Sequence, residues 1–136
     1  VYTGLVLQKE GYQILRPFGL TDSQFNVLML LKYQTRDGAM NQTKLGDMLL
    51  VNRSNVTGLI DRLEKCGWVE RVPDPDDRRV KMIKLTEEGL KTLGQAEKVY
   101  TTEVIQAMSE FTDQERKTLT NLLQKIRDGL SEQNQK

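Results

Sequence analysis

The chain has 136 residues, of which 38% are hydrophobic and 29% are charged, and its formal net charge is +1. Its length suits one globular domain with a real core, and no apolar run approaches the roughly 20 residues that a membrane span needs. The near-neutral charge gives no overall argument for nucleic acid, so such an argument depends on where the charges lie. Because the chain opens on Val1 and carries no signal-peptide pattern, we expect a cytoplasmic protein that lacks its natural N-terminus.

Metal binding and catalysis find little support in the composition. There is one cysteine and no histidine, whereas zinc and copper sites usually use several such ligands. The missing histidine also removes the most common general base and the usual Ser-His or Cys-His pairs. No glycine-rich phosphate loop is present. We therefore expect no catalytic residue, no metal and no cofactor, which argues against an enzyme.

The N-terminal part of the chain is predicted to form two helices. Residues 1–16 have amphipathic spacing, and Pro17 ends this helix because the residue before a proline is pushed out of helical geometry. Thr21 or Ser23 can cap the next helix. Apolar residues at helical spacing cover a broad surface of that second helix, which predicts that it is buried between other elements. They are Phe25, Val27, Leu28, Met29, Leu30 and Leu31.

The central segment, residues 41–89, is the most informative part of the chain. Asn41 is predicted to cap a short helix, and after a turn at residues 50–51 Asn52 is predicted to cap a second one, which ends at Gly67. Two helices joined by so short a turn form a helix-turn-helix arrangement. The second helix has one apolar face, formed by Val56, Leu59, Ile60 and Leu63. The opposite face carries Ser54, Gly58, Asp61 and Lys65, flanked by Thr57 and Arg62.

A hairpin and two long helices are predicted to follow. Residues 68–72 and 80–85 read as paired strands around a turn rich in aspartate and arginine. Thr86 is predicted to cap a helix that runs to about Met108, and a capping box at residues 112–115 starts the last helix. The terminal helices have apolar stripes that nothing in the chain obviously covers. A second copy of the chain would cover them, so we expect a homodimer.

An exposed polar helix face followed by a basic hairpin points to duplex DNA. Such a helix can fill a major groove while the hairpin contacts the adjacent backbone or minor groove. The order and spacing of residues 59–71, and of residues 74–79 leading to 85–89, resemble those of the multiple-antibiotic-resistance regulator (MarR) family of bacterial winged-helix transcription factors. The resemblance extends from Arg16 to the final helix. It implies a mainly α fold with a small β-hairpin, in which dimerisation helices flank a winged helix-turn-helix.

The resemblance also implies a domain organisation and a function. Residues 1–136 would form one winged-helix domain, with about 21–88 as the DNA-binding lobe and about 1–16 and 89–132 as the dimerisation helices. Members of the family are cytoplasmic homodimers that bind palindromic operator DNA, often as repressors. Many are released from DNA by a small aromatic or anionic effector. We expect the same partners here.

Carried over to this chain, the resemblance assigns a set of DNA-binding residues. In the wing, Asp77 would brace Arg79, whose planar cation suits the negative potential of a narrow minor groove, and Arg78 lies beside them. Two positions depart from the family pattern: Leu50 stands where many members have glycine, and Asp76 stands near the wing tip where many have arginine. The helix residues that would face bases or phosphates are Arg53, Ser54, Asn55, Thr57, Gly58 and Arg62.

Other interpretations stay open for individual residues. Arg78 and Arg79 by themselves would be typical of a solvated turn. Asp61 either pairs locally with Arg62 or Lys65, which we favour, or accepts from a cytosine amino group.

Cys66 is either a small packed residue at the helix end, which we favour, or a redox sensor. If Cys66→Ser responds to peroxide as the parent does, Cys66 is not the sensor. The candidates to line an effector pocket are Tyr12, Arg16, Phe18 and Tyr33, with core packing as the alternative role of the aromatic ones.

Rival functions for the whole chain are a winged-helix module for protein or RNA contacts, and an enzyme with an unrecognised site. Activation in place of repression depends on where an operator lies relative to the promoter.

Overall fold

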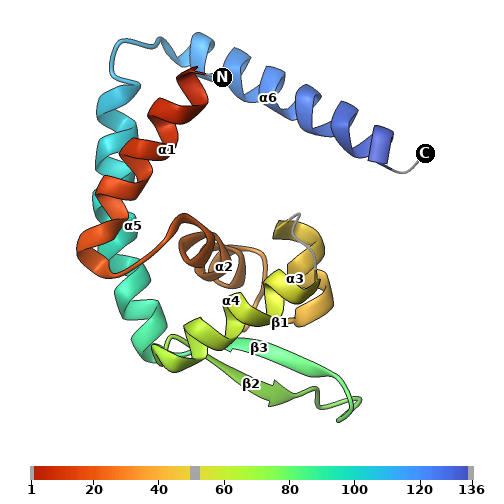
Figure 1. Cartoon of the computed structure of the whole chain (residues 1–136). Helices are drawn as coiled ribbons and strands as arrows, with labels where there is room; N and C mark the ends of the chain where they lie inside the picture. Colours follow the sequence, from red (N-terminus) through yellow and green to blue (C-terminus); the bar gives the residue numbers. More distant parts are fainter. Residues whose placement is uncertain (1, 50–52, 135–136) are drawn as a thin grey trace. The chain divides into compact units, whose positions relative to one another are not determined.

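The computed structural model describes residues 2–49 and 53–134 of the chain (Figure 1). Its elements are, in order, α1 (Tyr2–Leu15), the 3₁₀ turn η1 (Arg16–Phe18), α2 (Asp22–Tyr33), β1 (Ala39–Asn41), α3 (Gln42–Leu49), α4 (Arg53–Lys65), β2 (Val69–Pro73), β3 (Lys81–Leu85), α5 (Glu87–Ala107) and α6 (Asp113–Asn134).

The chain packs as two compact units. The first is Val1–Tyr100 and the second is Thr101–Lys136, so the boundary falls within α5. The first unit holds the helix-turn-helix and the sheet, and the second holds the end of α5 and all of α6. Within the described residues, no helix combines the length and the apolar character that a membrane span requires.

The start of α2 is fixed by a capping box. The Gln24 N–H donates to Thr21 Oγ1 at 3.2 Å, and the Thr21 N–H donates to Gln24 Oε1 at 3.0 Å. Thr21, and not Ser23, is therefore the cap. Before it, α1 ends at Leu15, and the turn that contains Pro17 tightens into 3₁₀ geometry instead of leaving helical geometry at once.

The sheet is antiparallel, with strand order β1-β3-β2. Strands β2 and β3 form the predicted hairpin, which starts and ends within a residue of the expected positions. Strand β1 was not predicted: it has three residues and pairs with the other edge of β3, with Met40 opposite Ile83. So short a strand depends on a partner far away in the sequence, which local periodicity cannot reveal.

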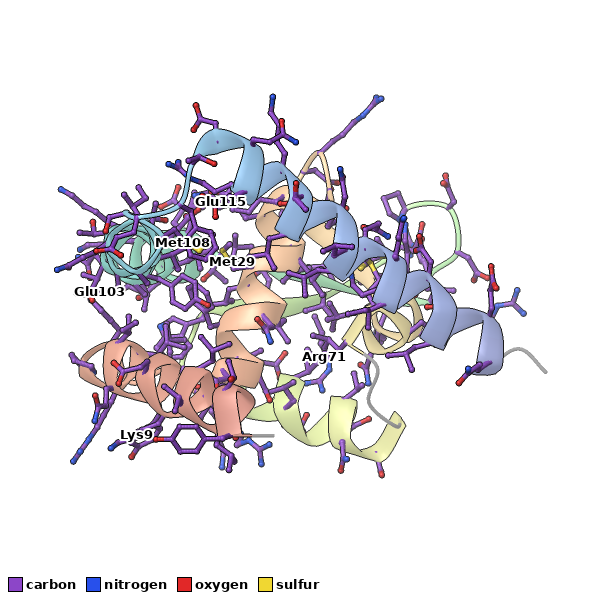
Figure 2. All side chains as sticks on the ribbon, turned by 90° about the horizontal axis from the view of Figure 1, so that it is seen from above. Lys9, Met29, Arg71, Glu103, Met108 and Glu115 are labelled. Atoms are coloured by element: carbon purple, nitrogen blue, oxygen red, sulfur yellow. The ribbon has the colours of Figure 1, made fainter. Side chains whose placement is uncertain are left out.

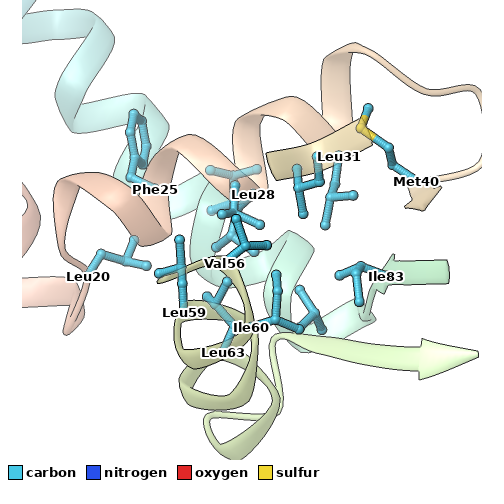
Figure 3. Close-up of a cluster of buried hydrophobic side chains, with 14 of the residues drawn as sticks. Leu20, Phe25, Leu28, Leu31, Met40, Val56, Leu59, Ile60, Leu63 and Ile83 are labelled. Atoms are coloured by element: carbon cyan, nitrogen blue, oxygen red, sulfur yellow. The ribbon is translucent and has the colours of Figure 1, made fainter. Parts of the chain in front are cut away.

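The hydrophobic core of the first unit lies between α2, α4 and the sheet. Side chains of α2, α4 and β3, among them Leu28, Ile60 and Ile83, gather in one buried cluster (Figure 3). As predicted, α2 is buried between other elements, and one face of α4 enters the core. The first half of α5 closes this core with Leu93 and Ala96, and the Tyr100 ring packs on the Phe25 ring at a centroid distance of 5.0 Å.

Helix α6 of the second unit leaves its large apolar side chains exposed. The capping box predicted for α6 is present, since the Glu115 N–H donates to Thr112 Oγ1 at 3.1 Å and the Thr112 N–H donates to Glu115 Oε1 at 3.0 Å. The apolar residues of α6 recur at helical spacing, and each is more than a third exposed. They are Leu119, Leu122, Leu123, Ile126 and Leu130.

Candidate nucleic-acid interface

Helix α4 presents one face to the core and the other to solvent. Its C-terminus is closed by Gly67 at φ 75°, with the Trp68 N–H donating to the Leu63 carbonyl at 3.1 Å and the Gly67 N–H to the Glu64 carbonyl at 2.9 Å. These two bonds form a Schellman motif, which confirms the predicted left-handed cap. The predicted cap at Asn52 and the departure at Leu50 lie outside the described residues.

The position of α4 is set by close packing on α3. A Cβ atom added to Gly46 of α3 would stand 3.0 Å from Val56 Cγ2, so glycine lets the two helices approach closely. At the other end of the contact, Gln42 Nε2 donates to Thr57 Oγ1 at 3.1 Å. The first residues of α3 therefore hold the side of α4 that carries Thr57.

The structure brings most of the predicted helix residues together on one surface. Arg53 is the first residue of α4. Gly58 is half-buried, and the other predicted members with described side chains are exposed. They are Ser54, Asn55, Thr57 and Arg62.

The wing turn is held by hydrogen bonds within the hairpin. The Asp74 N–H donates to the Val80 carbonyl at 3.0 Å, and the Val80 N–H donates to the Asp77 carbonyl at 2.9 Å. Asp74 Oδ1 accepts from the Asp76 N–H at 2.8 Å, so the turn is braced by its own aspartates. Figure 1 shows the hairpin extending beyond the helices of the first unit at this turn.

Asp77 and Arg79 form the contact that the resemblance implies. Asp77 Oδ1 accepts from Arg79 Nε and from the Arg79 backbone N–H, each at 3.1 Å, and Asp77 Oδ2 accepts from Arg79 Nη2 at 3.3 Å. The side-chain hydrogen bonds from Arg79, followed by the backbone one, hold the pKa of Asp77 below its usual value. The Arg79 side chain remains 91% exposed. Arg78 is exposed beside it.

Asp61 does have a local partner, but it is not the predicted one. Its Oδ1 accepts from Arg71 Nη2 at 2.5 Å, and Glu64 Oε1 accepts from Arg71 Nη1 at 3.0 Å. Arg71 belongs to β2 and is labelled in Figure 2. Spacing along a helix suggested Arg62 or Lys65, whereas the observed contact arises because the strand folds back against α4.

Cys66 differs from expectation. The thiol lies just past α4 in an exposed residue and is not packed as a small apolar side chain. The Schellman turn places the C-terminal end of α4 at the surface, so the Cys66 side chain is exposed to solvent.

The four effector candidates have different environments. Phe18 packs against the core, while Tyr12 and Arg16 are exposed. Tyr33 lines an open hollow of about 320 Å³. Among the described residues, it is the only one of the four candidates that lines this hollow. The other lining residues are Asn26, Met29, Leu30, Gln34, Met48 and Leu49.

A polar cluster that joins α2 to α5 was missed at the sequence level. Glu97 accepts from Lys32 Nζ at 2.7 Å and also from the Tyr33 hydroxyl. Burial raises the pKa of Glu97, but the hydrogen bonds from Lys32 and Tyr33 outweigh that effect, so its pKa lies below the usual value. The bond to Glu97 correspondingly raises the pKa of Lys32. No sequence signal links residues so far apart.

The arrangement has close counterparts among known proteins. A family model described as the MarR family matches residues 20–81. The chain is 33% identical to the multiple antibiotic resistance protein MarR of Salmonella typhimurium, over 82% of this chain and 76% of that protein. It is 30% identical to the HTH-type transcriptional repressor YetL of Bacillus subtilis, over 83% of this chain and 67% of that protein. The crystal structure of Sco3205, a MarR family transcriptional regulator from Streptomyces coelicolor in complex with DNA, matches with a TM-score of 0.85 and 26% identity, covering 93% of this chain and 80% of that one.

The fold and the exposed helix beside a hairpin define a winged helix-turn-helix protein. The chain belongs to the MarR family of transcriptional regulators. This confirms the resemblance drawn from the sequence motifs and the mainly α fold class with its small antiparallel sheet.

Proposed function

We propose that the chain is a sequence-specific DNA-binding regulator that acts as a homodimeric repressor. The observation that carries the proposal is the display of α4 and the wing: an exposed polar helix face stands beside a hairpin whose Arg79 is held by Asp77 while it reaches solvent. In this arrangement α4 enters the major groove and Arg79 enters the adjacent minor groove. Sco3205 in complex with DNA and the repressor YetL support the proposal by similarity.

The DNA-binding residues are the ones assigned from the family pattern. Asp77 orients Arg79 and makes no DNA contact of its own, and Arg78 meets phosphates. Bacterial promoter DNA lies in the cytoplasm, so we propose that this regulator is a cytoplasmic protein. The helix residues that contact bases or phosphates are Arg53, Ser54, Asn55, Thr57, Gly58 and Arg62.

The homodimer is proposed from the exposed apolar stripe of α6 and from exposed apolar residues of α1. Leu122, Ile126 and Leu130 of α6 are 51%, 58% and 57% exposed, and Leu5 of α1 is 58% exposed. Water-soluble monomers rarely leave so long an apolar stripe uncovered. A two-fold dimer covers it and presents two copies of α4 to the half-sites of a palindromic operator. The DNA-binding lobe is then about residues 21–88, and the dimerisation helices are about 1–16 and 89–132.

Release by a small effector completes the proposal. An effector shifts the population away from the DNA-competent state if it binds more tightly to the dimer whose two α4 helices have a spacing that does not fit DNA. Tyr33, at the rim of a hollow lined by apolar side chains and two amides, is the best placed of the four candidates for a small aromatic ligand.

Fluorescence anisotropy with the duplex upstream of this protein's own gene, beside a scrambled duplex at physiological salt, tests DNA binding. The native duplex is expected to bind more tightly, and Arg79→Ala and Arg62→Ala are each expected to weaken it by about tenfold. Equal binding of both duplexes with no effect of either variant would contradict the proposal. A weak response to salt would favour a protein-contact module, because neutralised phosphates make the affinity for DNA or RNA fall steeply with salt.

A further inference from the structure

Arg71 connects the two elements that the proposed function brings to DNA. We propose that Arg71 is a positioning residue: by holding Asp61 and Glu64 of α4, it fixes the hairpin relative to that helix and neutralises carboxylates that would otherwise face phosphates. This inference rests on the proposed function, because it assigns a role in DNA binding to a residue outside the predicted contact set.

Three hydrogen bonds make the connection. Arg71 Nη2 lies 2.5 Å from Asp61 Oδ1, Arg71 Nη1 lies 3.0 Å from Glu64 Oε1, and the Arg71 backbone N–H donates to Glu64 Oε2 at 3.3 Å. Strand β2 is an edge strand, so the last of these bonds satisfies a backbone donor that no neighbouring strand takes. Glu64 therefore binds both the side chain and the backbone of the same strand residue.

The sheet register directs the Arg71 side chain toward α4. Arg71 pairs with Ile83, which is fully buried in the core that α4 shares. Paired residues of an antiparallel ladder project from the same face of the sheet. The Arg71 side chain is consequently only 23% exposed, whereas those of Asp61 and Glu64 are 58% and 44% exposed.

Arginine suits this position better than lysine does. Asp61 and Glu64 are three residues apart, so their carboxylates lie on neighbouring parts of one helix face. A planar guanidinium can bind both carboxylates through different nitrogens, while the ammonium of a lysine is a point charge on a flexible stem. The Schellman turn joins α4 to β2 at one end of the strand, and Arg71 adds a second attachment at the middle of β2.

A double-mutant cycle on DNA affinity tests the positioning role. Arg71→Gln is made in the parent and in an Asp61→Asn, Glu64→Gln background, and the upstream duplex is titrated by anisotropy at several salt concentrations. Coupling predicts a loss of about tenfold in the parent and less than about twofold in the neutral background. Arg71→Lys is expected to recover only part of the loss. Arg36→Gln, a change at an exposed loop arginine, is the matched control and should leave affinity unchanged.

A direct phosphate contact by Arg71 would overturn the inference. In that case Arg71→Gln would cost the same in both backgrounds and lower the salt slope by about 0.9. Equal losses of DNA affinity in both backgrounds, without a change in the salt slope, would also overturn it, because the effect of Arg71 would then not depend on Asp61 and Glu64.

A DNA-free measurement separates failure of this inference from failure of the proposed function. Amide hydrogen exchange in residues 69–73 should rise in Arg71→Gln, and it should rise no further when the change is made in the neutral background. Exchange at Leu28 and Leu31 of α2 should stay constant, which excludes general unfolding. If the parent protein prefers no duplex, the proposed function fails, and hydrogen exchange alone then tests whether Arg71 holds β2 against α4. Unchanged amide exchange in β2 of Arg71→Gln would overturn the positioning role.

Discussion

Asp77 and Arg79 illustrate how a single side chain can restrain an exposed arginine. Two oxygens of Asp77 accept from the guanidinium and the backbone of Arg79, so the long side chain is restrained while most of it remains in solvent. Restraint before binding would lower the entropy that is lost in the proposed contact of this arginine with DNA. In the proposed DNA-binding wing, the acid would thus be useful despite its charge.

The carboxyl resonance of Asp77 offers a direct check of this contact. We expect the pKa of Asp77 to lie below the usual range of aspartates in the parent, and to rise toward that range in Arg79→Ala, which removes the side-chain hydrogen bonds and keeps the backbone one. Because the folded-state pKa is lowered, the contribution of the pair is present above the unfolded pKa and is lost as pH falls through the folded one. An unchanged Asp77 titration in Arg79→Ala would show that the contact does not persist in solution.

Among the elements, the junction between the wing and α5 leaves no room for a side chain at Gly89. Thr86 caps α5 by accepting from the Gly89 N–H at 3.0 Å, and its hydroxyl donates to the Gly67 carbonyl at 2.6 Å. A Cβ atom on Gly89 would stand 2.0 Å from the Trp68 carbonyl oxygen. Glycine at this position therefore lets α5 begin directly against the turn that follows α4.

Two glycines of α5 allow a matched comparison. Gly89→Ala is expected to destabilise the protein by about 1–3 kcal/mol, because the added methyl group would push the backbone of α5 away from the backbone of Trp68. Gly94→Ala meets open space in the same helix and is expected to stabilise it by up to about 1 kcal/mol. Urea unfolding of both variants gives the two free energies; equal values would contradict the packing account.

The elements also show which features a sequence can predict. The caps at Thr21, Gly67 and Thr112 were predictable because each depends on residues within one helical turn. Strand β1 and the partner of Asp61 were not, because both depend on chain segments that only the folded structure brings together. The solvent-exposed polar face of α4 was predictable from helical periodicity. The exposure of Cys66 did not, since it depends on how the helix end meets the strand.

At the scale of the whole molecule, the proposed dimer accounts for the uncovered face of α6. Leu122→Glu with Ile126→Glu would place charges in the proposed interface and is expected to yield a monomer by sedimentation, with operator affinity reduced at least tenfold because one half-site is lost. Asn121→Glu adds a charge outside the apolar stripe and should leave the dimer intact. A parent chain that sediments as a monomer would refute this part of the proposal.

In the proposed mode of action, two copies of the chain read a two-fold symmetric DNA site through α4 and the wing. Selection of duplexes from a randomised library by the parent protein tests it most directly, with Arg79→Ala selected in parallel. We expect enrichment of a palindrome whose half-site centres lie about one helical turn, or a multiple of it, apart, and weaker enrichment by the variant. No enriched sequence, or an enriched sequence without two-fold symmetry, would contradict it.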